Sequence, residues 1–375
     1  MKTNIVNIIT TLDEGGAEAT LFKLAKNSNN LNYKLTVISL MDIGKYGSLL
    51  KNKNVNVITL NMNRGKFSLR SFLKLYQIIK KINPDVVQTW LYHADFLGGI
   101  IAKLLRIKII IWNIRTSEYY DKDASLKTKI IIKLNSILSH FIPNKIVYCS
   151  YRSINIHERI GYAKKSYFIP NGYDLDLFRE DIDEKKRLRI KYGIEEECFV
   201  IGFVSRFHPI KNHELLIDAV KLITSKHKNI KCIFVGKNIK NNKFLQEKII
   251  EKKIENFFIF LDGMTDIYNF MNIYDLHILP SKGEGFPNVI AETMSCGVIN
   301  ISTDVGDAPE ILLNKDYIFE QNKQSLSDLI IHLKKLRKIN IKQWEKLKKA
   351  SIEKISNNYS LEKMCKKYYE LWNND

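Results

Sequence analysis

Two glutamates stand eight residues apart in a glycine-rich segment that follows an apolar run. The segment is Leu279-Pro-Ser-Lys-Gly-Glu-Gly-Phe-Pro-Asn-Val-Ile-Ala-Glu292, and it predicts a strand, a turn and the start of a helix. Backbone N–H groups at a helix start can hold a phosphate or a hydroxyl-rich group. A carboxylate accepts two hydrogen bonds side by side, which suits the neighbouring hydroxyls of a ribose or another sugar. For the whole segment, this interpretation outweighs the alternative that Glu284 and Glu292 are solvated surface residues.

Two cations flank a second predicted strand-to-helix loop. Arg206 follows the apolar run 200–205, and Lys211 shortly precedes a predicted helix over His213–Ser225. Two fixed cations in one loop can bind a diphosphate and stabilise the charge that it develops on leaving. Most basic pairs are simply solvated, but the nearby glutamate segment favours an anion site here.

The elements that must position these loops belong to an alternating α/β pattern. The chain has 375 residues, of which 45% are hydrophobic and 26% charged, as in a globular protein large enough for two domains. The pattern restarts after Pro170-Asn171-Gly172. We therefore expect two Rossmann-like parallel-sheet domains, 1–172 and 173–355, with a helix over 356–375 that returns to the first domain. Because parallel sheets bind ligands beyond the carboxyl ends of their strands, we expect the active site in a cleft between facing domains.

The expected elements follow the β-branched runs and the helical spacing. In the first domain the expected strands are Asn4–Thr10, Lys34–Leu40, Val55–Leu60, Asp85–Trp90, Lys108–Asn113 and Lys145–Cys149, and the expected helices are Ala17–Lys26, Ser68–Ile82 and Leu126–Ser139. In the second domain the expected strands are Val200–Ser205, Lys231–Val235, Phe257–Leu261, Leu276–Leu279 and Val298–Ser302, and a helix is expected over Asn288–Ser295. The charged stretch Arg179–Lys191 is interpreted as a linker.

The charge balance indicates an anionic partner. There are 59 Lys and Arg against 40 Asp and Glu, a net charge of +19, and residues 1–180 hold 27 basic and 13 acidic side chains. An anionic membrane surface, a phosphorylated substrate or nucleic acid would fit, and coding bias would explain about half of the excess. Lys66–Lys81 and Ser125–Ser139 are basic with apolar residues at helical spacing, so we expect their polar sides to face such a membrane.

Cysteine usage and the apolar runs point to the cytoplasm. The five cysteines are scattered without a CxxC pair, which disfavours a disulfide framework or a zinc module. The N-terminal residues are typical of a short strand, and they show no targeting segment. The most apolar long window, 95–114, contains four charged residues, so we expect no membrane span.

The motifs, taken in order, resemble family 4 glycosyltransferases of the GT-B fold. The resemblance spans residues 15–311 and rests on Gly15-Gly16-Ala17-Glu18, Pro170-Asn171-Gly172, Arg206 with Lys211, Glu284 with Glu292, Thr303-Asp304 and Glu310-Ile311. It implies a retaining enzyme that moves a sugar from a UDP-sugar or GDP-sugar donor to a lipid-linked saccharide acceptor. It also implies a role in bacterial surface polysaccharide, lipopolysaccharide or capsule assembly, at the inner face of the plasma membrane.

The resemblance assigns roles to individual residues. Arg206 and Lys211 would hold the diphosphate, Glu284 would contact the donor sugar, and Glu292 would bind the ribose. The other donor-binding residues that it implies are Gly15 and Gly16, where the backbone can approach closely, and Gly285, Phe286, Pro287 and Asn288.

The catalytic histidine departs from the family pattern. Many members carry His-x-His where this chain has Gln88 and Trp90, and His93 is the nearest imidazole. His93 would join Arg206, Lys211 and Glu284 as a catalytic residue by bonding a sugar hydroxyl or a phosphate. The alternative is a structurally bonded histidine. Arg115 and Glu118 are the candidates for contact with the acceptor.

We expect neither a metal nor a cofactor. Asp-x-Asp pairs at 121/123, 174/176 and 181/183 could hold a divalent cation, but all lie in charged loops or linkers away from strand ends. Two other functions stay open. The net charge of +19 would fit a nucleic-acid-binding protein, although no recognition motif is present. The Gln88 and Trp90 position would fit an inactive subunit that binds sugar nucleotides.

Overall fold

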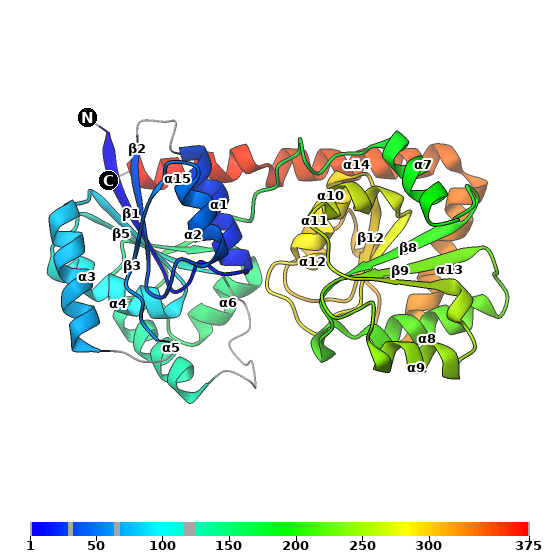
Figure 1. Cartoon of the computed structure of the whole chain (residues 1–375), viewed down its shortest axis with the longest axis horizontal. Helices are drawn as coiled ribbons and strands as arrows, with labels where there is room; N and C mark the ends of the chain where they lie inside the picture. The colour runs from blue at the N-terminus through cyan, green and yellow to red at the C-terminus, as the bar shows by residue number, and fades with distance from the viewer. Residues whose placement is uncertain (1, 29–32, 64–67, 116–124, 374–375) are drawn as a thin grey trace. The chain divides into compact units, whose positions relative to one another are not determined.

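The chain divides into two compact α/β units. In this computed structural model, unit 1 comprises Met1–Gly172 and Leu361–Asp375, and unit 2 comprises Tyr173–Ser360. The structure describes residues 2–28, 33–63, 68–115 and 125–373. Each unit is built on one parallel sheet (Figure 1), so the expectation of two parallel-sheet α/β domains is confirmed.

Unit 1 contains a seven-stranded parallel sheet in the order β3-β2-β1-β4-β5-β6-β7. Its strands are β1 (Thr3–Ile9), β2 (Tyr33–Ser39), β3 (Asn56–Thr59), β4 (Val86–Trp90), β5 (Ile109–Ile114), β6 (Lys145–Tyr148) and β7 (Ser166–Phe168). Ile5 and Ile9 of β1 are fully buried on one face, and Val6 and Ile8 on the other. A strand that is apolar on both faces needs a helical layer on each side of the sheet.

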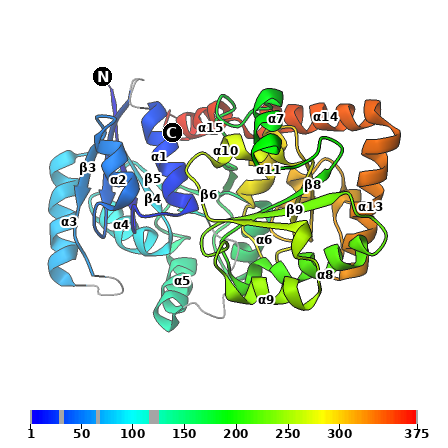
Figure 2. The same ribbon diagram turned by 45° about the vertical axis from the view of Figure 1, so that its right-hand side comes forward.

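The helices of unit 1 form those two layers (Figures 1 and 2). One layer consists of α3 (Leu69–Ile82), α4 (Tyr92–Leu104) and α5 (Leu126–Leu138), whose apolar side chains share a core with Val6 and Ile8. The other consists of α1 (Gly16–Ser28), α2 (Gly44–Lys51) and α15 (Leu361–Asn373), which share a core with Ile5 and Ile9. A further helix, α6 (Tyr151–Arg159), follows β6.

The C-terminal helix α15 is fastened to the centre of the unit 1 sheet. The Trp372 indole N–H donates to Gln88 Oε1 at 2.6 Å, and the Tyr368 hydroxyl donates to Asn113 Oδ1 at 2.8 Å. The Trp90 ring lies 5.8 Å from that of Tyr368, and Gln88 and Trp90 are both fully buried. The two residues at the family's His-x-His position therefore face α15 in the core of unit 1.

Unit 2 contains a five-stranded parallel sheet in the order β10-β9-β8-β11-β12. Its strands are β8 (Phe199–Val204), β9 (Ile230–Val235), β10 (Phe258–Leu261), β11 (Leu276–Leu279) and β12 (Ile299–Ser302). Its helices are α7 (Ile182–Lys191), α8 (His213–Thr224), α9 (Lys243–Glu251), α10 (Ile267–Phe270), α11 (Asn288–Ser295), α12 (Ala308–Ile311), α13 (Lys323–Ile339) and α14 (Ile341–Tyr359). One apolar core joins α8 and α13 to the sheet.

Three expectations from the sequence were wrong in part. The stretch Arg179–Lys191 contains α7, because Asp181 caps its N-terminus by accepting from the Glu184 N–H at 2.9 Å. The helix expected over 356–375 is interrupted at Ser360, between α14 and α15. The outward face of α5 is not polar alone, since Leu126, Ile130, Leu134 and Ile137 are exposed there beside basic residues.

No helix in the described part of the chain is both long and apolar enough to cross a bilayer. The five cysteines are buried, and none of them forms a disulfide bond.

A buried carboxylate joins α7 and α13 to the sheet of unit 2. Asp275 accepts from Lys185 Nζ at 2.8 Å, Arg189 Nη2 at 2.7 Å, Arg337 Nη1 at 3.1 Å and the Val200 N–H at 2.8 Å. Burial raises the pKa of Asp275, but the three cations outweigh burial and hold the pKa below its usual value. The ionised carboxylate therefore stabilises the fold above the pKa that Asp has in the unfolded chain, and this contribution is lost as the pH falls through the lower native value.

We predict that Asp275→Asn lowers the free energy of unfolding of unit 2 by about 3–5 kcal/mol at pH 7, because it leaves buried cations without a counter-ion. Urea unfolding measures the loss, which should shrink toward acid pH. The control is Asp218→Asn, which removes the exposed partner of Lys252 and should cost less than about 1 kcal/mol. Equal losses in the two variants would contradict the assignment.

Candidate active site

The predicted binding loops of unit 2 meet where the strand order of its sheet reverses. Strand β8 has β9 on one side and β11 on the other. The loops that follow β8 and β11 leave the same edge of the sheet and diverge to opposite sides. Such a reversal is the usual place for a ligand in an open parallel sheet.

An ion pair joins the two loops. Lys211 Nζ lies 2.5 Å from Glu284 Oε1, and the Ser281 hydroxyl donates to the same oxygen at 2.7 Å. The Lys282 N–H also donates to the Ile210 carbonyl at 2.7 Å. The structure thus brings together a cation and a carboxylate that the sequence placed in separate motifs.

Local residue preferences determine the backbone conformation of the loop after β8. Residues Pro209–Lys211 form a short 3₁₀ turn that begins with proline and is capped by His208, which accepts from the Ile210 N–H at 3.3 Å. Asn212 has a φ of 56°, a left-handed conformation that asparagine tolerates well. The chain then enters α8 at His213, which is buried and lies 3.2 Å from the Ser205 hydroxyl through Nε2.

His213 contributes no charge to this loop. Burial, and then the charge of Lys211, lower its pKa to about 4, so the ring is neutral at pH 7 and can exchange a hydrogen bond with Ser205. Neither His213 nor Ser281 is among the site residues predicted from the sequence. The signal for Ser281 was present, because it stands three residues before Glu284 in the same glycine-rich segment.

The loop after β12 supports the glutamate loop. Gly306 has a φ of 51°, and a Cβ there would lie 2.1 Å from the Gly285 carbonyl oxygen. The Asp307 N–H donates to that oxygen at 3.3 Å, and the Thr303 hydroxyl donates to the Ser281 carbonyl at 2.6 Å. Only glycine permits this approach, so residue 306 helps to place Glu284.

The remaining predicted donor residues lie around these loops. Arg206 is exposed directly after β8, and no hydrogen bond or ion pair joins its side chain to the residues that the structure describes. Phe286 and Pro287 are buried at the start of α11, and Glu292 is half-buried one turn beyond Asn288 on the same helix face. The Tyr173 hydroxyl donates to Asn288 Oδ1 at 2.7 Å.

A second reversal of strand order lies in unit 1, between β1 and β4. The loop after β1 leads to Gly15 and Gly16, and the turn after β4 leads to His93, the second residue of α4. Leu91 in that turn has a φ of 74°. A branched side chain in this region is strained by about 1–3 kcal/mol, and such strain is concentrated at functional sites.

His93 is half-buried, and burial lowers its pKa, so the imidazole is neutral at pH 7. Among the described residues it has no hydrogen-bond partner. The bonded histidine of this region is His157, whose Nδ1 donates to the Ser153 carbonyl at 2.7 Å and whose Nε2 accepts from the Tyr92 hydroxyl at 2.7 Å. His93 therefore keeps both ring nitrogens for a ligand, within the described part of the chain.

The glycines of the β1 loop are close to a carboxyl group of their own helix. A Cβ on Gly15 would lie 2.2 Å from Glu18 Oε2. Burial raises the pKa of Glu18, which stands in the first turn of α1. The close approach that the resemblance assigns to Gly15 is therefore, at least in part, an approach to Glu18.

Arg115 is held inside unit 1. Its guanidinium donates to the Ile169 carbonyl and the Tyr368 hydroxyl, each at 3.3 Å, and to Asn171 Oδ1. It also lies 5.7 Å from the centre of the Trp90 ring. These contacts tie the end of unit 1 to α15. Glu118, the other predicted acceptor residue, lies outside the described residues.

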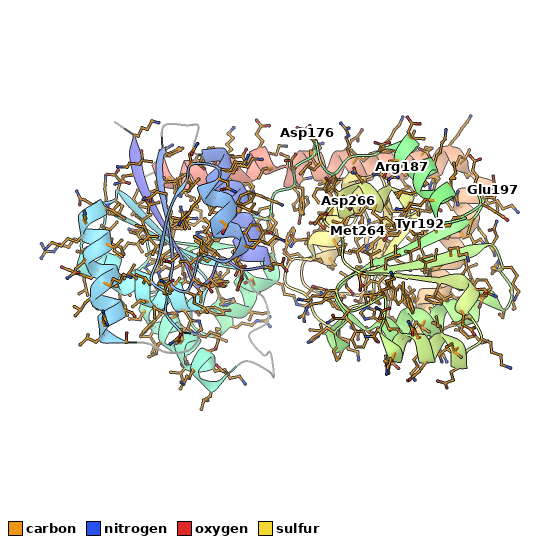
Figure 3. All side chains as sticks on the ribbon, in the orientation of Figure 1. Asp176, Arg187, Tyr192, Glu197, Met264 and Asp266 are labelled. Carbon is orange, nitrogen blue, oxygen red and sulfur yellow. The ribbon has the colours of Figure 1, made fainter. Side chains whose placement is uncertain are left out.

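The Asp-x-Asp pairs that the structure describes are not at the carboxyl ends of strands. Asp174 accepts from the Asp176 N–H at 3.2 Å in the loop before α7, where Figure 3 labels Asp176. Asp181 caps α7. The described residues contain no cluster of three or more His, Cys, Asp or Glu that could hold a metal ion. The pair at 121/123 lies outside them.

Comparison with known proteins covers nearly the whole chain. Residues 14–177 match the family model described as Glycosyltransferase Family 4, and residues 184–368 match the model described as Glycosyl transferases group 1.

Two curated relatives and one solved structure illustrate the similarity. The UDP-Gal:alpha-D-GlcNAc-diphosphoundecaprenol alpha-1,3-galactosyltransferase of Escherichia coli is 23% identical over 81% of this chain and 79% of its own length. The capsular polysaccharide biosynthesis glycosyltransferase CapM of Staphylococcus aureus is 25% identical over 78% of each chain. The crystal structure of Anabaena HepE in complex with UDP superposes with a TM-score of 0.85, at 21% identity, over 98% of this chain and 99% of that one.

We predict that Gly306→Ala destabilises unit 2 much more than Gly193→Ala. Both glycines have left-handed φ angles, but a Cβ on Gly193 meets nothing within 4 Å. Gly193→Ala should therefore cost only the backbone preference, about 1–2 kcal/mol. Gly306→Ala must also displace the glutamate loop, for a total of about 3–4 kcal/mol. Urea unfolding compares the two variants, and equal costs would show that the β12 loop does not support Gly285.

Proposed function

The chain belongs to the family 4 glycosyltransferases, and on that premise we propose that it is a retaining enzyme with a nucleotide-diphosphate-sugar donor and a lipid-linked saccharide acceptor. Unit 2 would bind the donor, and unit 1 would bind the acceptor. The observation that carries the proposal is the ion pair between Lys211 and Glu284 at the strand reversal of unit 2, where the loop of Lys211 also carries Arg206.

The order of charges in this site suits a nucleotide sugar. The donor has its diphosphate directly beside the hydroxyls of the sugar. Lys211 and Glu284 place a cation directly beside a carboxylate. On binding, the phosphate would take over Lys211, and the sugar hydroxyls would donate to Glu284. Arg206, exposed at the end of β8, would close on the diphosphate from the other end of its loop.

The same arrangement can assist departure of the nucleotide. When the bond between the sugar and the diphosphate breaks, negative charge grows on the phosphate oxygens. Two cations fixed next to those oxygens stabilise the charge in the transition state more than in the bound donor. Lys211 and Arg206 would supply this positive charge, so the proposal needs no metal ion or cofactor.

The remaining donor residues would hold the nucleoside. Glu292 lies on α11 and would accept from the ribose hydroxyls. The backbone of Gly285, Phe286, Pro287 and Asn288 approaches the start of that helix, where N–H groups favour an anion. We propose UDP as the nucleotide, in line with the donor in the name of the Escherichia coli relative and with the HepE complex. GDP is the alternative.

In unit 1, we assign the contact with the reacting sugar to His93. Its neutral ring can donate a hydrogen bond to a sugar hydroxyl or a phosphate and accept one at the other nitrogen. The backbone at Gly15 and Gly16 would leave room for the ligand to approach closely. Arg115 and Glu118 are the proposed acceptor contacts, with Arg115 acting from the position that Asn171 and Tyr368 give it.

The names of two relatives support the acceptor class and the pathway that we propose. The Escherichia coli enzyme is named for a diphosphoundecaprenol-linked sugar, and CapM is named for capsular polysaccharide biosynthesis. We extend both to this chain: a lipid-linked acceptor in surface polysaccharide, lipopolysaccharide or capsule assembly. The enzyme would then be cytoplasmic and bound peripherally to the anionic inner face of the plasma membrane, with no nucleic acid as partner.

Thermal melting with UDP, GDP and their sugar conjugates tests the donor site. A ligand that binds only the native state raises the melting temperature by mass action. We expect a shift with one base series in the wild type, and a smaller shift in Arg206→Ala and Lys211→Ala. Lys226→Ala, an exposed lysine that follows α8, should keep the full shift.

Turnover of the same donor, measured as release of nucleoside diphosphate, should fall about 10²–10³-fold in Arg206→Ala and Lys211→Ala. Normal turnover in both variants would refute the leaving-group role. No shift with any nucleotide, in a protein that melts cooperatively, would refute the donor site itself.

We predict that His93→Gln lowers donor turnover without reducing the melting shift given by the nucleoside diphosphate alone, because the nucleotide would bind unit 2 and His93 of unit 1 would contact the reacting sugar. General acid–base or hydrogen-bonding contributions of this kind amount to about 10²–10⁴-fold. His332→Gln, an exposed histidine on α13, is the control. A donor shift without turnover in the wild type would instead support the inactive sugar-nucleotide subunit.

A further inference from the structure

The outer face of α5 carries an apolar stripe that the active site does not use. Leu126, Ile130, Leu134 and Ile137 are between 40% and 74% exposed, and Phe141, just beyond the helix, is 69% exposed. The four helical residues stand at positions i, i+4, i+8 and i+11, so they form one stripe along the helix. Scattered exposed apolar residues are normal, but a continuous stripe marks an interaction surface.

The opposite face of α5 fixes this orientation. Asn135 and Ser136 are buried against the unit, together with Ile132. The Asn135 amide donates to the Tyr92 carbonyl in α4 at 2.9 Å. The helix therefore buries two polar residues beside Ile132 and leaves four leucines and isoleucines exposed, which is unusual for a surface helix. Rotating the stripe inward would break the Asn135 bond.

Basic side chains line both edges of the stripe. At 100° per residue, Lys127 lies on one side, and Lys129 and Lys133 lie on the other. All three are exposed, and residues 125–141 contain no acidic residue. Long lysine side chains can reach past an apolar stripe to place their charges at the level of lipid headgroups.

The neighbouring helix α3 continues this surface. Both α3 and α5 pack beside α4 in the same layer of unit 1 (Figure 2). The exposed residues of α3 include Leu69 and Leu73 next to Arg70, Lys74 and Lys81. Residues 68–82 also lack acidic side chains. The layer thus presents positive charge and apolar residues together.

We propose that the outer face of α5, flanked by the basic side of α3, docks unit 1 on an anionic lipid bilayer. The apolar stripe lies at the boundary between headgroups and acyl chains, and the lysines contact the lipid phosphates. This inference rests on the proposed function. It names the surface of unit 1 that would contact the membrane in which the lipid-linked acceptor lies.

A second copy of the chain is a poorer occupant of this stripe. Pairing two α5 helices through their stripes would bring Lys127, Lys129 and Lys133 of both copies together. Since α5 has no acidic residue to pair with them, the like charges would repel in a dimer. An anionic bilayer instead supplies the missing negative charge.

Vesicle sedimentation tests the surface without the transfer reaction. The probes are vesicles of phosphatidylcholine alone and of phosphatidylcholine mixed with phosphatidylglycerol. We expect the full chain to bind the anionic vesicles. Leu126→Gln/Ile130→Gln/Ile137→Gln should abolish binding, and Lys127→Gln/Lys129→Gln/Lys133→Gln should weaken it about 100-fold, at about fivefold per lysine.

The matched control is Ile190→Gln/Ile339→Gln, which changes two isoleucines of unit 2 that are 82% and 81% exposed. It should bind as the wild type does. Wild-type binding by the triple leucine–isoleucine variant, or equal loss in the control, would overturn the proposal. The UDP melting shift, measured on every variant, reports the donor site separately, so loss of the donor site and loss of docking are distinguishable.

Quenching by brominated lipid gives a second test that does not depend on losing binding. The four native tryptophans, Trp90, Trp112, Trp344 and Trp372, are all buried. We expect brominated phosphatidylcholine in anionic vesicles to quench the added fluorescence of Ile130→Trp but not that of Ile190→Trp. Absence of quenching at residue 130 would overturn the proposal. So would a concentration-dependent dimer, seen by sedimentation equilibrium without vesicles, that the apolar triple variant abolishes.

Discussion

Parallel pairing of the strands is the constraint on which the rest of this structure depends. In a parallel sheet every strand ends at the same edge, so the loops that follow the strands gather there. The reversal of strand order between β8 and β11 then sends the next two helices to opposite sides and leaves room between their loops. The ion pair between Lys211 and Glu284 occupies that place. Seventy-three residues separate them in the chain, and only the sheet brings them within bonding distance.

The interior of unit 1 gives a structural role to the residues that depart from the family pattern. In unit 1, Gln88 and Trp90 hold α15 against the sheet through Trp372 and Tyr368. A buried amide needs a partner, and Trp372 supplies one. The change at the family's His-x-His position is thus accompanied by a structural use of the two residues. His93, one turn later, lies beside the strained Leu91 and keeps its ring available among the described residues.

The helices of unit 1 differ in which side chains they bury and which they expose. Helices α1, α2 and α15 bury apolar faces in the usual way, whereas α5 buries Asn135 and Ser136 beside Ile132 and exposes Leu126, Ile130, Leu134 and Ile137. Exposed apolar area is unfavourable in water. A helix that exposes such a stripe between lysines gains from contact with an anionic bilayer, and the lipid linkage proposed for the acceptor would place the enzyme there.

The amino-acid sequence was enough to predict the alternation of strands and helices, the restart of this pattern after residue 172 and the residues in the loops between them. These follow from local patterns: β-branched runs, helical spacing, and the glycines and prolines of the turns. Ser68 illustrates this, since it caps α3 by accepting from the Ser71 N–H at 3.2 Å. The tertiary structure, and not the local sequence, brings Ser281 and Lys211 to one oxygen of Glu284 and places Gly306 against Gly285. The orientation of α5 was decided there too, because a helical pattern specifies an apolar face but not which neighbour, if any, that face will meet.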